Sequence, residues 1–250
     1  MTRLATAAFA AALALVAAGP AAAQGALSDA ERDAVDARIR AYLLENPEVI
    51  MEALEVLERR RLAAQDEADA QIIASRAAAL YDDGYSHVFG DPNGDVTIVE
   101  FSDYRCGYCK AAHPEIEKLL EEDGDIRLVL KEFPILGADS TFASRAAMAA
   151  RRIDEDAYGP FHAAMMEWRG QLGEAQVMAL AAEVGLDGDA LRVEMEDPAI
   201  DAQLRANHQL ARDLGIEGTP SFVIGDRLVR GFARPEQMRA FVAEARDREG

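Results

Sequence analysis

Two cysteines separated by two residues are the feature of this sequence best suited to chemistry. Cys106 and Cys109 follow a β-branched run at residues 96–101 and precede residues 110–122, whose apolar spacing predicts a helix. A thiol at a helix N-terminus lies near unpaired N–H groups and the positive end of the helix dipole, which lower its pKa from about 8.5 to roughly 3.5–7.5. Because only a thiolate attacks disulfides, the motif predicts Cys106 as nucleophile and Cys109, one turn further, as the resolving thiol.

Three other uses of the two thiols stay open at this point. A structural disulfide closing so short a loop stabilises by only about 2 kcal/mol in the loop-entropy model. A zinc site needs two more ligands at short spacing, whereas the four histidines are scattered singly. Two thiolates three residues apart also suit Cu(I), so a copper-binding or copper-tolerance protein with Cys106 and Cys109 as ligands is the alternative from another class.

Glu100 is a carboxylate in the otherwise apolar run that precedes the cysteines. Burying a carboxylate costs free energy unless the group has a charged partner or takes part in the chemistry. We therefore expect Glu100 to lie beneath the dithiol and to exchange the proton of Cys109. Lys131, on the next predicted strand, is its candidate partner. The alternative is an edge position where Glu100 is simply solvated.

The dipeptide Thr219-Pro220 stands just before a returning strand, where proline is tolerated at the strand start or, in the cis form, in a tight turn. By itself it is an ordinary turn, and its position after a long helical block makes it a candidate site element. His113, one turn after Cys109, is either structural or tunes the dithiol.

The elements that must position these residues form a strand–helix–strand unit, a helical block and a strand hairpin with a closing helix. Glycines predict interruptions of the helical block near 159–160, 170–173 and 185–188. The predicted ranges are strands at 96–101 and 126–131, helices at 110–122 and about 140–214, strands at 221–224 and 228–229, and a helix from Pro235.

An α-helical segment is predicted ahead of this unit. Ser28 and Glu31 form a capping box, and the helix should end near Asn46-Pro47, with Asn46 as the cap of a second helix. Two amphipathic helices with no strand between them cannot bury their apolar stripes alone, so we interpret residues 24–88 as an arm and linker that pack against copies of the chain. Packing back onto the main domain is the alternative.

The first 23 residues have the three regions of a secretory signal peptide: Arg3, an apolar stretch, and small residues at Ala21 and Ala23. The apolar stretch is shorter than the roughly 20 residues of a spanning helix, so cleavage is favoured over membrane anchoring and no stable membrane insertion is expected. Export to an oxidising compartment would allow a disulfide to form and persist.

Composition bounds the remaining choices. The 250 residues include 50% hydrophobic ones, enough for a core, so disorder is excluded. With 26 Lys+Arg against 45 Asp+Glu the formal net charge is −19, which would repel phosphate backbones and anionic lipids. Nucleic acid is therefore not an expected partner.

The element order, together with residues 101–109 (FSDYRCGYC) and 131–137 (KEFPILG), resembles the DsbA-like thioredoxin-fold oxidoreductases over about residues 88–247. The resemblance implies an α/β thioredoxin fold with a helical insertion at about 139–214 in a catalytic domain of residues 89–250. It also implies that Cys106 is an exposed nucleophile, Cys109 a buried resolving thiol and Glu100 a buried acid beside Lys131. Pro220 would be a cis-proline, and the Thr219 backbone would pair with the substrate chain.

Within that family, residues 42–50 (YLLENPEVI) look like the N-terminal oligomerisation segment of the suppressor-of-copper-sensitivity protein C group, some of whose members are trimeric disulfide isomerases. The strongest oxidases of the family carry a histidine between the cysteines, where this chain has Gly107 and Tyr108. Losing that donor makes the disulfide less oxidising, and Thr219, as in isomerases of the wider fold, indicates the same.

The resemblance therefore implies a periplasmic disulfide isomerase or reductase acting on exported proteins, with a disulfide-donating oxidase as the alternative. A homo-oligomer is expected, with a trimer favoured. The redox partner would be a membrane thiol reductase, or a quinone-linked oxidase for the alternative. No dissociable cofactor is implied beyond the redox-active pair Cys106 and Cys109.

Overall fold

The computed structural model describes residues 28–249, and the predicted signal peptide lies outside the described residues. The chain divides into two compact units, residues 1–59 and 60–250. Within the described residues no helix is both long and apolar enough to cross a membrane. The helices are α1 (Asp29–Glu45), α2 (Glu48–Ser75), α3 (Ala77–Tyr81), α4 (Gly107–Asp123), α5 (Ala138–Ile153), α6 (Glu155–Glu167), α7 (Glu174–Glu183), α8 (Gly188–Met195), α9 (Pro198–Asp213) and α10 (Pro235–Glu249).

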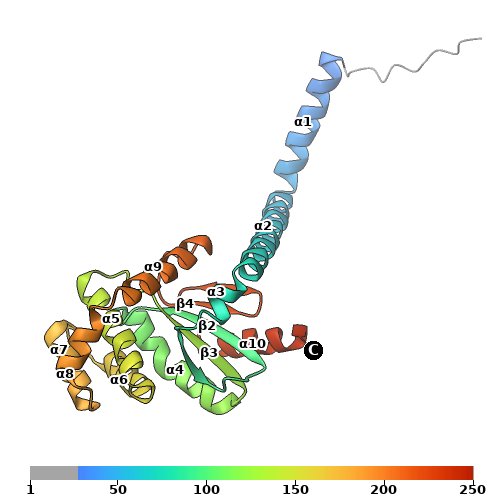
Figure 1. The fold of residues 1–250 in the computed structure, drawn as a ribbon. Helices are drawn as coiled ribbons and strands as arrows, with labels where there is room; N and C mark the ends of the chain where they lie inside the picture. The colour runs from blue at the N-terminus through green and yellow to red at the C-terminus, as the bar shows by residue number, and fades with distance from the viewer. Residues whose placement is uncertain (1–27, 250) are drawn as a thin grey trace, which may run out of the picture. The chain divides into compact units, whose positions relative to one another are not determined.

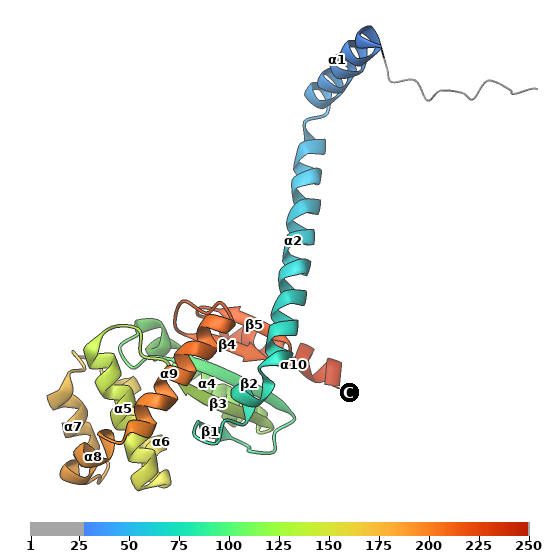
Figure 2. The same cartoon turned by 45° about the horizontal axis from the view of Figure 1, so that its top comes forward.

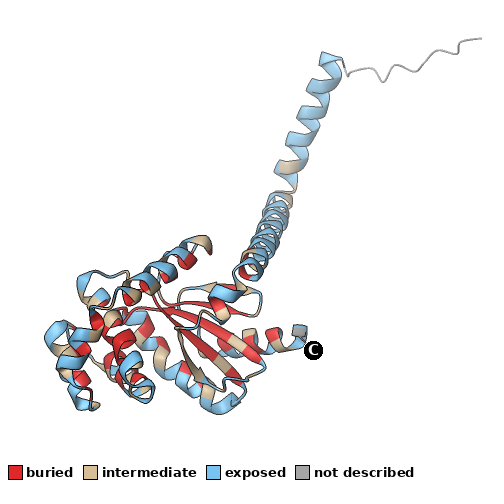
Figure 3. Ribbon diagram, viewed as in Figure 1, coloured by how far each residue is buried: buried red, intermediate tan, exposed pale blue. Residues whose placement is uncertain are grey.

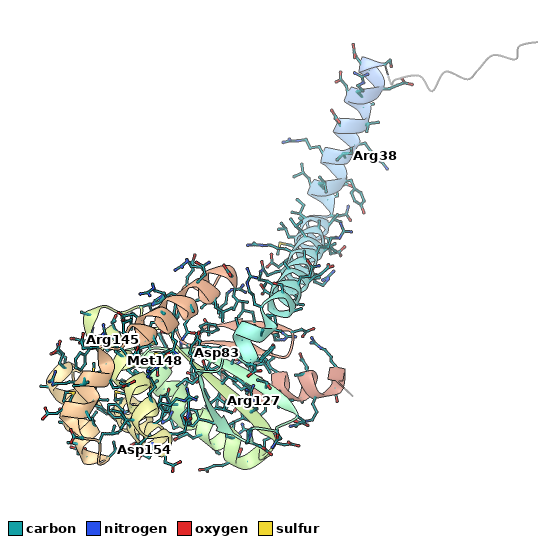
Figure 4. The ribbon with its side chains drawn as sticks, in the orientation of Figure 1. Arg38, Asp83, Arg127, Arg145, Met148 and Asp154 are labelled. Atoms are coloured by element: carbon teal, nitrogen blue, oxygen red, sulfur yellow. The ribbon has the colours of Figure 1, made fainter. Side chains whose placement is uncertain are left out.

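The described part of the first unit is helical, as expected. The Ser28 side chain accepts from the Glu31 backbone and the Glu31 carboxylate accepts from the Ser28 backbone, which confirms the capping box. Asn46 does not cap the second helix as predicted, because its amide donates to the Tyr42 carbonyl at 2.9 Å and so closes the end of α1. No residue of α1 is buried, and Arg38 projects into solvent from it (Figure 4).

The predicted boundary of the arm at residue 88 is too late. Ile73 and Leu80 are buried in a core cluster with Phe101 of the sheet. The Asp69 carboxylate, also buried, accepts two hydrogen bonds from the Arg230 guanidinium, at 2.9 and 3.0 Å. The chain from Asp69 onward therefore packs within the unit of residues 60–250, well before residue 88.

A five-stranded sheet forms the centre of the second unit (Figure 1), and its strands, all labelled in Figure 2, follow the order β1-β3-β2-β4-β5. Strands β2 and β3 are parallel, and the other neighbours are antiparallel. The β-branched runs form the buried strands, as predicted, and Figure 3 shows them buried along most of their length. The short edge strand β1 was not predicted. The strands are β1 (His87–Gly90), β2 (Val96–Ser102), β3 (Ile126–Glu132), β4 (Ser221–Ile224) and β5 (Arg227–Arg230).

Helices cover both faces of the sheet (Figure 2). Helices α4 and α10 pack on one face through Ile116 and Val242, against Ile98 of β2. Helix α9 and the short α3 pack on the other face, against Val99 and Val129. This arrangement leaves the carboxyl end of β2 free to lead into α4, which places the two cysteines at that edge of the sheet.

The helical insertion between β3 and β4 consists of α5 to α9, close to the predicted range. Its core is closely packed alanine, methionine and leucine side chains. The break expected at Gly159-Pro160 is wrong, because Pro160 lies inside α6. The interruption falls instead at Asp154, which ends α5 and caps α6 by accepting from the Asp156 N–H at 3.0 Å.

Candidate active site

Cys106 is the N-cap residue of α4, as the sequence predicted. Its Sγ accepts a hydrogen bond from the Cys109 N–H at 3.4 Å, and its carbonyl begins the helix by accepting from Lys110 N at 3.1 Å. The two cysteines are thiols in this structure. The first helical turn therefore supplies its free N–H groups to the sulfur of Cys106.

The two thiols have opposite acidities. The pKa of Cys106 is lowered to about 5, chiefly by its hydrogen bond with the Cys109 thiol, with smaller contributions from Thr219 and from backbone N–H groups, and against the effect of burial. The pKa of Cys109 is raised, chiefly because its thiol donates a hydrogen bond to the Cys106 thiolate. Burial and the negative charge of Glu100 raise it further. At neutral pH the Cys106 sulfur is thus the thiolate, and it is the one of the two that is suited to act as a nucleophile.

The expectation that Cys106 is an exposed thiol is wrong for this form of the protein. Cys106 exposes only 6% of its surface and Cys109 none. The sulfur of Cys106 lies against the loop that carries Pro220, and only a small part of the residue reaches the surface.

The Thr219–Pro220 peptide bond is cis, as the resemblance implied. The Thr219 carbonyl accepts from the Cys106 Sγ at 3.2 Å, so the loop lies directly against the nucleophile. The pairing of β4 with β2, Ser221 opposite Phe101, holds the loop in this place. The sequence-distant Thr219-Pro220 and the cysteine motif therefore form one site.

Glu100 is buried in a central strand, which excludes the solvated edge position. It lies opposite Leu130 of β3 on one side and Phe222 of β4 on the other. Burial raises the pKa of Glu100 to about 7, opposed by the nearby Ser102 hydroxyl and reinforced by negative charge at Cys106 and Glu132. A carboxyl that is half ionised near neutral pH is suited to accept a proton from Cys109.

The predicted pairing of Glu100 with Lys131 is wrong. Lys131 lies opposite Phe101 in the parallel register, so its side chain and that of Glu100 project from opposite faces of the sheet. The Lys131 ammonium is fully buried and donates to the Asp83 carboxylate at 2.5 Å and to the Ala79 carbonyl at 2.8 Å. Asp83, labelled in Figure 4, belongs to the loop between α3 and β1, so Lys131 anchors that loop rather than the dithiol.

Glu132 is a buried carboxyl to which the sequence analysis gave no role. It accepts hydrogen bonds from Tyr104 at 2.8 Å, Tyr158 at 2.9 Å and Ser144 at 2.7 Å. Burial raises its pKa to about 7, against the effect of these donors. Glu132 lies opposite Ser102, on the sheet face of Glu100, and period-two alternation along β3 was the signal that could have found it.

Asp103 is a second residue that sequence reasoning missed. Its fully buried carboxylate accepts from the backbone N–H groups of Arg105, Ile135 and Leu136, at 2.8 to 3.0 Å, and from the Ser140 hydroxyl at 2.8 Å. It thereby ties the turn before Cys106 to the loop after β3. Its presence in the FSDYRCGYC segment was the available signal.

A cavity of about 360 Å³, open solvent included, adjoins this site. Glu100 lines it together with two histidines, His113 of α4 and His162 of α6. A further depression of about 640 Å³ lies beside Gly107 and is lined by Arg105, Lys110 and Arg169. The buried acid thus faces a cavity, and the nucleophile has a basic depression next to it.

A thioredoxin-type sheet, an acidic thiol at a helix N-terminus and a cis-proline loop against that thiol together define a thiol–disulfide oxidoreductase of the thioredoxin fold. Residues 97–243 match the family described as "DSBA-like thioredoxin domain", and residues 31–64 match the "Copper resistance protein ScsC N-terminal domain". The chain belongs to the DsbA-like family, and within it is of the ScsC type.

Solved structures agree with this assignment. A thioredoxin-like oxidoreductase from Silicibacter pomeroyi is 45% identical, with a TM-score of 0.66, and the match covers 68% of this chain and 97% of that one. Proteus mirabilis ScsC in a transitional conformation is 31% identical over 89% of this chain and 98% of that one, with a TM-score of 0.66. The thiol–disulfide exchange protein alpha-DsbA2 from Wolbachia pipientis is 32% identical over 72% of this chain and 97% of that one, with a TM-score of 0.68.

One curated relative is much longer than the segment that matches this chain. The Na(+)/H(+) antiporter NhaA 1 of Salinispora arenicola is 29% identical over 160 residues, which are 64% of this chain but 24% of the antiporter. The chain therefore spans about a quarter of that protein.

Proposed function

We propose that this protein is a periplasmic disulfide isomerase or reductase that acts on misfolded or misoxidised exported proteins. The observation that carries the proposal is an acidic Cys106 thiol, set against the Thr219 loop, in a chain whose N-terminal helices expose apolar stripes. The residues between the cysteines, Gly107 and Tyr108, add no imidazole donor to the thiolate. The Tyr108 side chain is 68% exposed and offers an apolar contact for an unfolded client beside the nucleophile.

The reaction begins when the Cys106 thiolate attacks a client disulfide, forming a mixed disulfide and releasing one client thiolate. In isomerisation another client thiolate attacks the mixed disulfide, which forms a new client disulfide and returns Cys106 to the thiolate. In reduction Cys109 loses its proton to Glu100 and attacks Cys106, which releases the reduced client and leaves the Cys106–Cys109 disulfide. A membrane thiol reductase would then restore the dithiol.

The N-terminal helices support a homo-oligomer, with a trimer favoured. Val35, Ile39 and Tyr42 of α1 recur at four- and three-residue spacing, as do Ile50, Leu54 and Leu57 of α2, and each is between 45 and 63% exposed. This spacing is typical of helices that pack against one another, and a second copy of the chain supplies the matching surface. Several dithiols held in one assembly would raise the effective concentration of nucleophile around one bound client.

The function is tested by refolding a client with scrambled disulfides, using the full chain with and without a copper chelator. If the protein is an isomerase, the parent chain should restore native client with or without the chelator. Cys106→Ser should abolish this recovery. A steady-state redox assay in cells, with acid quenching and thiol alkylation, expects the pair mainly reduced. A mainly oxidised pair would favour the disulfide-donating oxidase, and copper-dependent activity would favour the copper-binding alternative.

The assembly is tested separately by light scattering on Leu54→Lys and Leu57→Lys, with Glu58→Lys as a control that adds the same side chain one position away. We expect the two leucine variants to lose oligomer mass and the control to retain it. Unchanged mass in both leucine variants would contradict assembly through the N-terminal helices.

A further inference from the structure

A cluster of three potential metal ligands lies outside the dithiol. His113 and Glu117 are one turn apart on α4, and Glu167 ends α6. One ligand atom from each side chain lies within 4.8 Å of the other two. The cluster therefore gathers one imidazole and two carboxylates from two helices of the same unit.

The imidazole of this cluster is incompletely satisfied. His113 Nε2 is buried without a hydrogen-bond partner, a state it shares among the described residues only with Ser102 Oγ. Glu117 Oε1 is 3.4 Å from Nε2, which is an ion-pair distance without hydrogen-bond geometry. The His113 side chain is 11% exposed, whereas that of Glu117 is 49% exposed, so the nitrogen is held in place while the carboxylates can adjust. A buried ring nitrogen that lacks a hydrogen-bond partner, on an imidazole grouped with two carboxylates, is suited to a cation held among the three side chains.

We propose that His113, Glu117 and Glu167 bind a divalent first-row cation of the Zn²⁺ type, independently of the two cysteines. One imidazole nitrogen and two carboxylate oxygens form a three-ligand set that leaves one tetrahedral position for water. Lys110 and Arg169 act electrostatically on His113 and oppose a cation there. Lys110 donates to the Met165 and Trp168 carbonyls, both at 2.7 Å, so its ammonium is held by other partners.

The position of the cluster links it to the redox site. His113 and Glu117 both line the cavity that Glu100 lines from the sheet side. A cation bound here would stand on the wall of that cavity and add positive charge on the side of the buried acid.

The test is a calorimetric titration of Zn²⁺ into the full chain with Cys106 and Cys109 oxidised to the disulfide, so that the thiols do not bind metal. The variants are His113→Ala, Glu117→Gln and Glu167→Gln. Glu115→Gln on the same helix is the matched control, because it removes the same charge from an exposed position outside the cluster. The two exposed glutamine variants keep the test valid if His113→Ala fails to fold.

We expect saturable binding of one Zn²⁺ per chain that is weakened about tenfold or more by loss of any of the three ligands, since removal of even an outer partner of a zinc ligand costs about 10- to 100-fold. The Glu115→Gln control should bind like the parent chain. Absence of Zn²⁺ binding to the oxidised parent, or binding that Glu117→Gln and Glu167→Gln leave unchanged, would overturn the proposal.

Discussion

The ionisation of Glu100 predicts how the stability of the dithiol protein depends on pH. The side chain is 6% exposed, and burial raises its pKa from 4.5 to about 7. Because a tenfold change in proton affinity corresponds to about 1.4 kcal/mol, this rise corresponds to about 3 kcal/mol. The folded chain holds the proton more tightly than the unfolded chain, so the associated stability is fully present below pH 4.5 and is lost as the pH rises to about 7.

Glu100→Gln removes this ionisable group while keeping its size. We measure the free energy of unfolding by urea for the reduced parent and the variant, between about pH 5 and pH 8. The free energy of unfolding of the variant, relative to that of the parent, should rise by about 2–3 kcal/mol from about pH 5 to pH 8. The reason is that the parent must bury a carboxylate at high pH and the variant does not. Glu115→Gln, at an exposed position of α4, should show no such gain.

A difference in unfolding free energy between variant and parent that stays constant with pH would refute this reasoning. It would mean that water solvates the Glu100 carboxylate through the adjoining cavity and that its ionisation is ordinary. The same result would remove the reason for assigning Glu100 as proton acceptor for Cys109.

Three further outcomes are expected. The ultraviolet absorbance of the Cys106 thiolate in the reduced protein should titrate with a midpoint near pH 5. Cys109→Ala should move the midpoint upward, because it removes the main hydrogen bond to the thiolate. An unmoved midpoint would contradict that cause. Lys131→Met should destabilise the fold by about 3–5 kcal/mol in urea unfolding, since it leaves the Asp83 carboxylate buried without its ion-pair partner. Adding Asp83→Asn to the same chain should recover part of that loss. The Cys106 titration should be unaltered in both variants. Asp103→Ala should cost at least about 3 kcal/mol in the same assay, because four donors lose their acceptor, and a loss below 1 kcal/mol would show that water replaces it.

The local parts of this protein were determined by the sequence alone. The β-branched run at β2, the helix start at Cys106, the capping box at Ser28 and the hairpin after Pro220 each depend on neighbouring residues, and the structure has all four. Such features follow from backbone hydrogen bonding and side-chain periodicity within a few residues. They were sufficient to place Cys106 and Cys109 at the start of a helix, whereas the contact of the Thr219-Pro220 loop with Cys106 was implied only by the family resemblance.

Pairings across the sheet were decided only by the tertiary structure. Glu100 and Lys131 are both charged residues in buried strands, and the sequence suggested that they pair, but the β2–β3 register places them on opposite faces. A change of one residue in register exchanges the two faces of a strand, and nothing in the local sequence fixes that parity between strands joined by a helix. The same register put Glu132 on the face of Glu100, and the tertiary fold alone brought Asp83 to Lys131 and the helical insertion to Glu132.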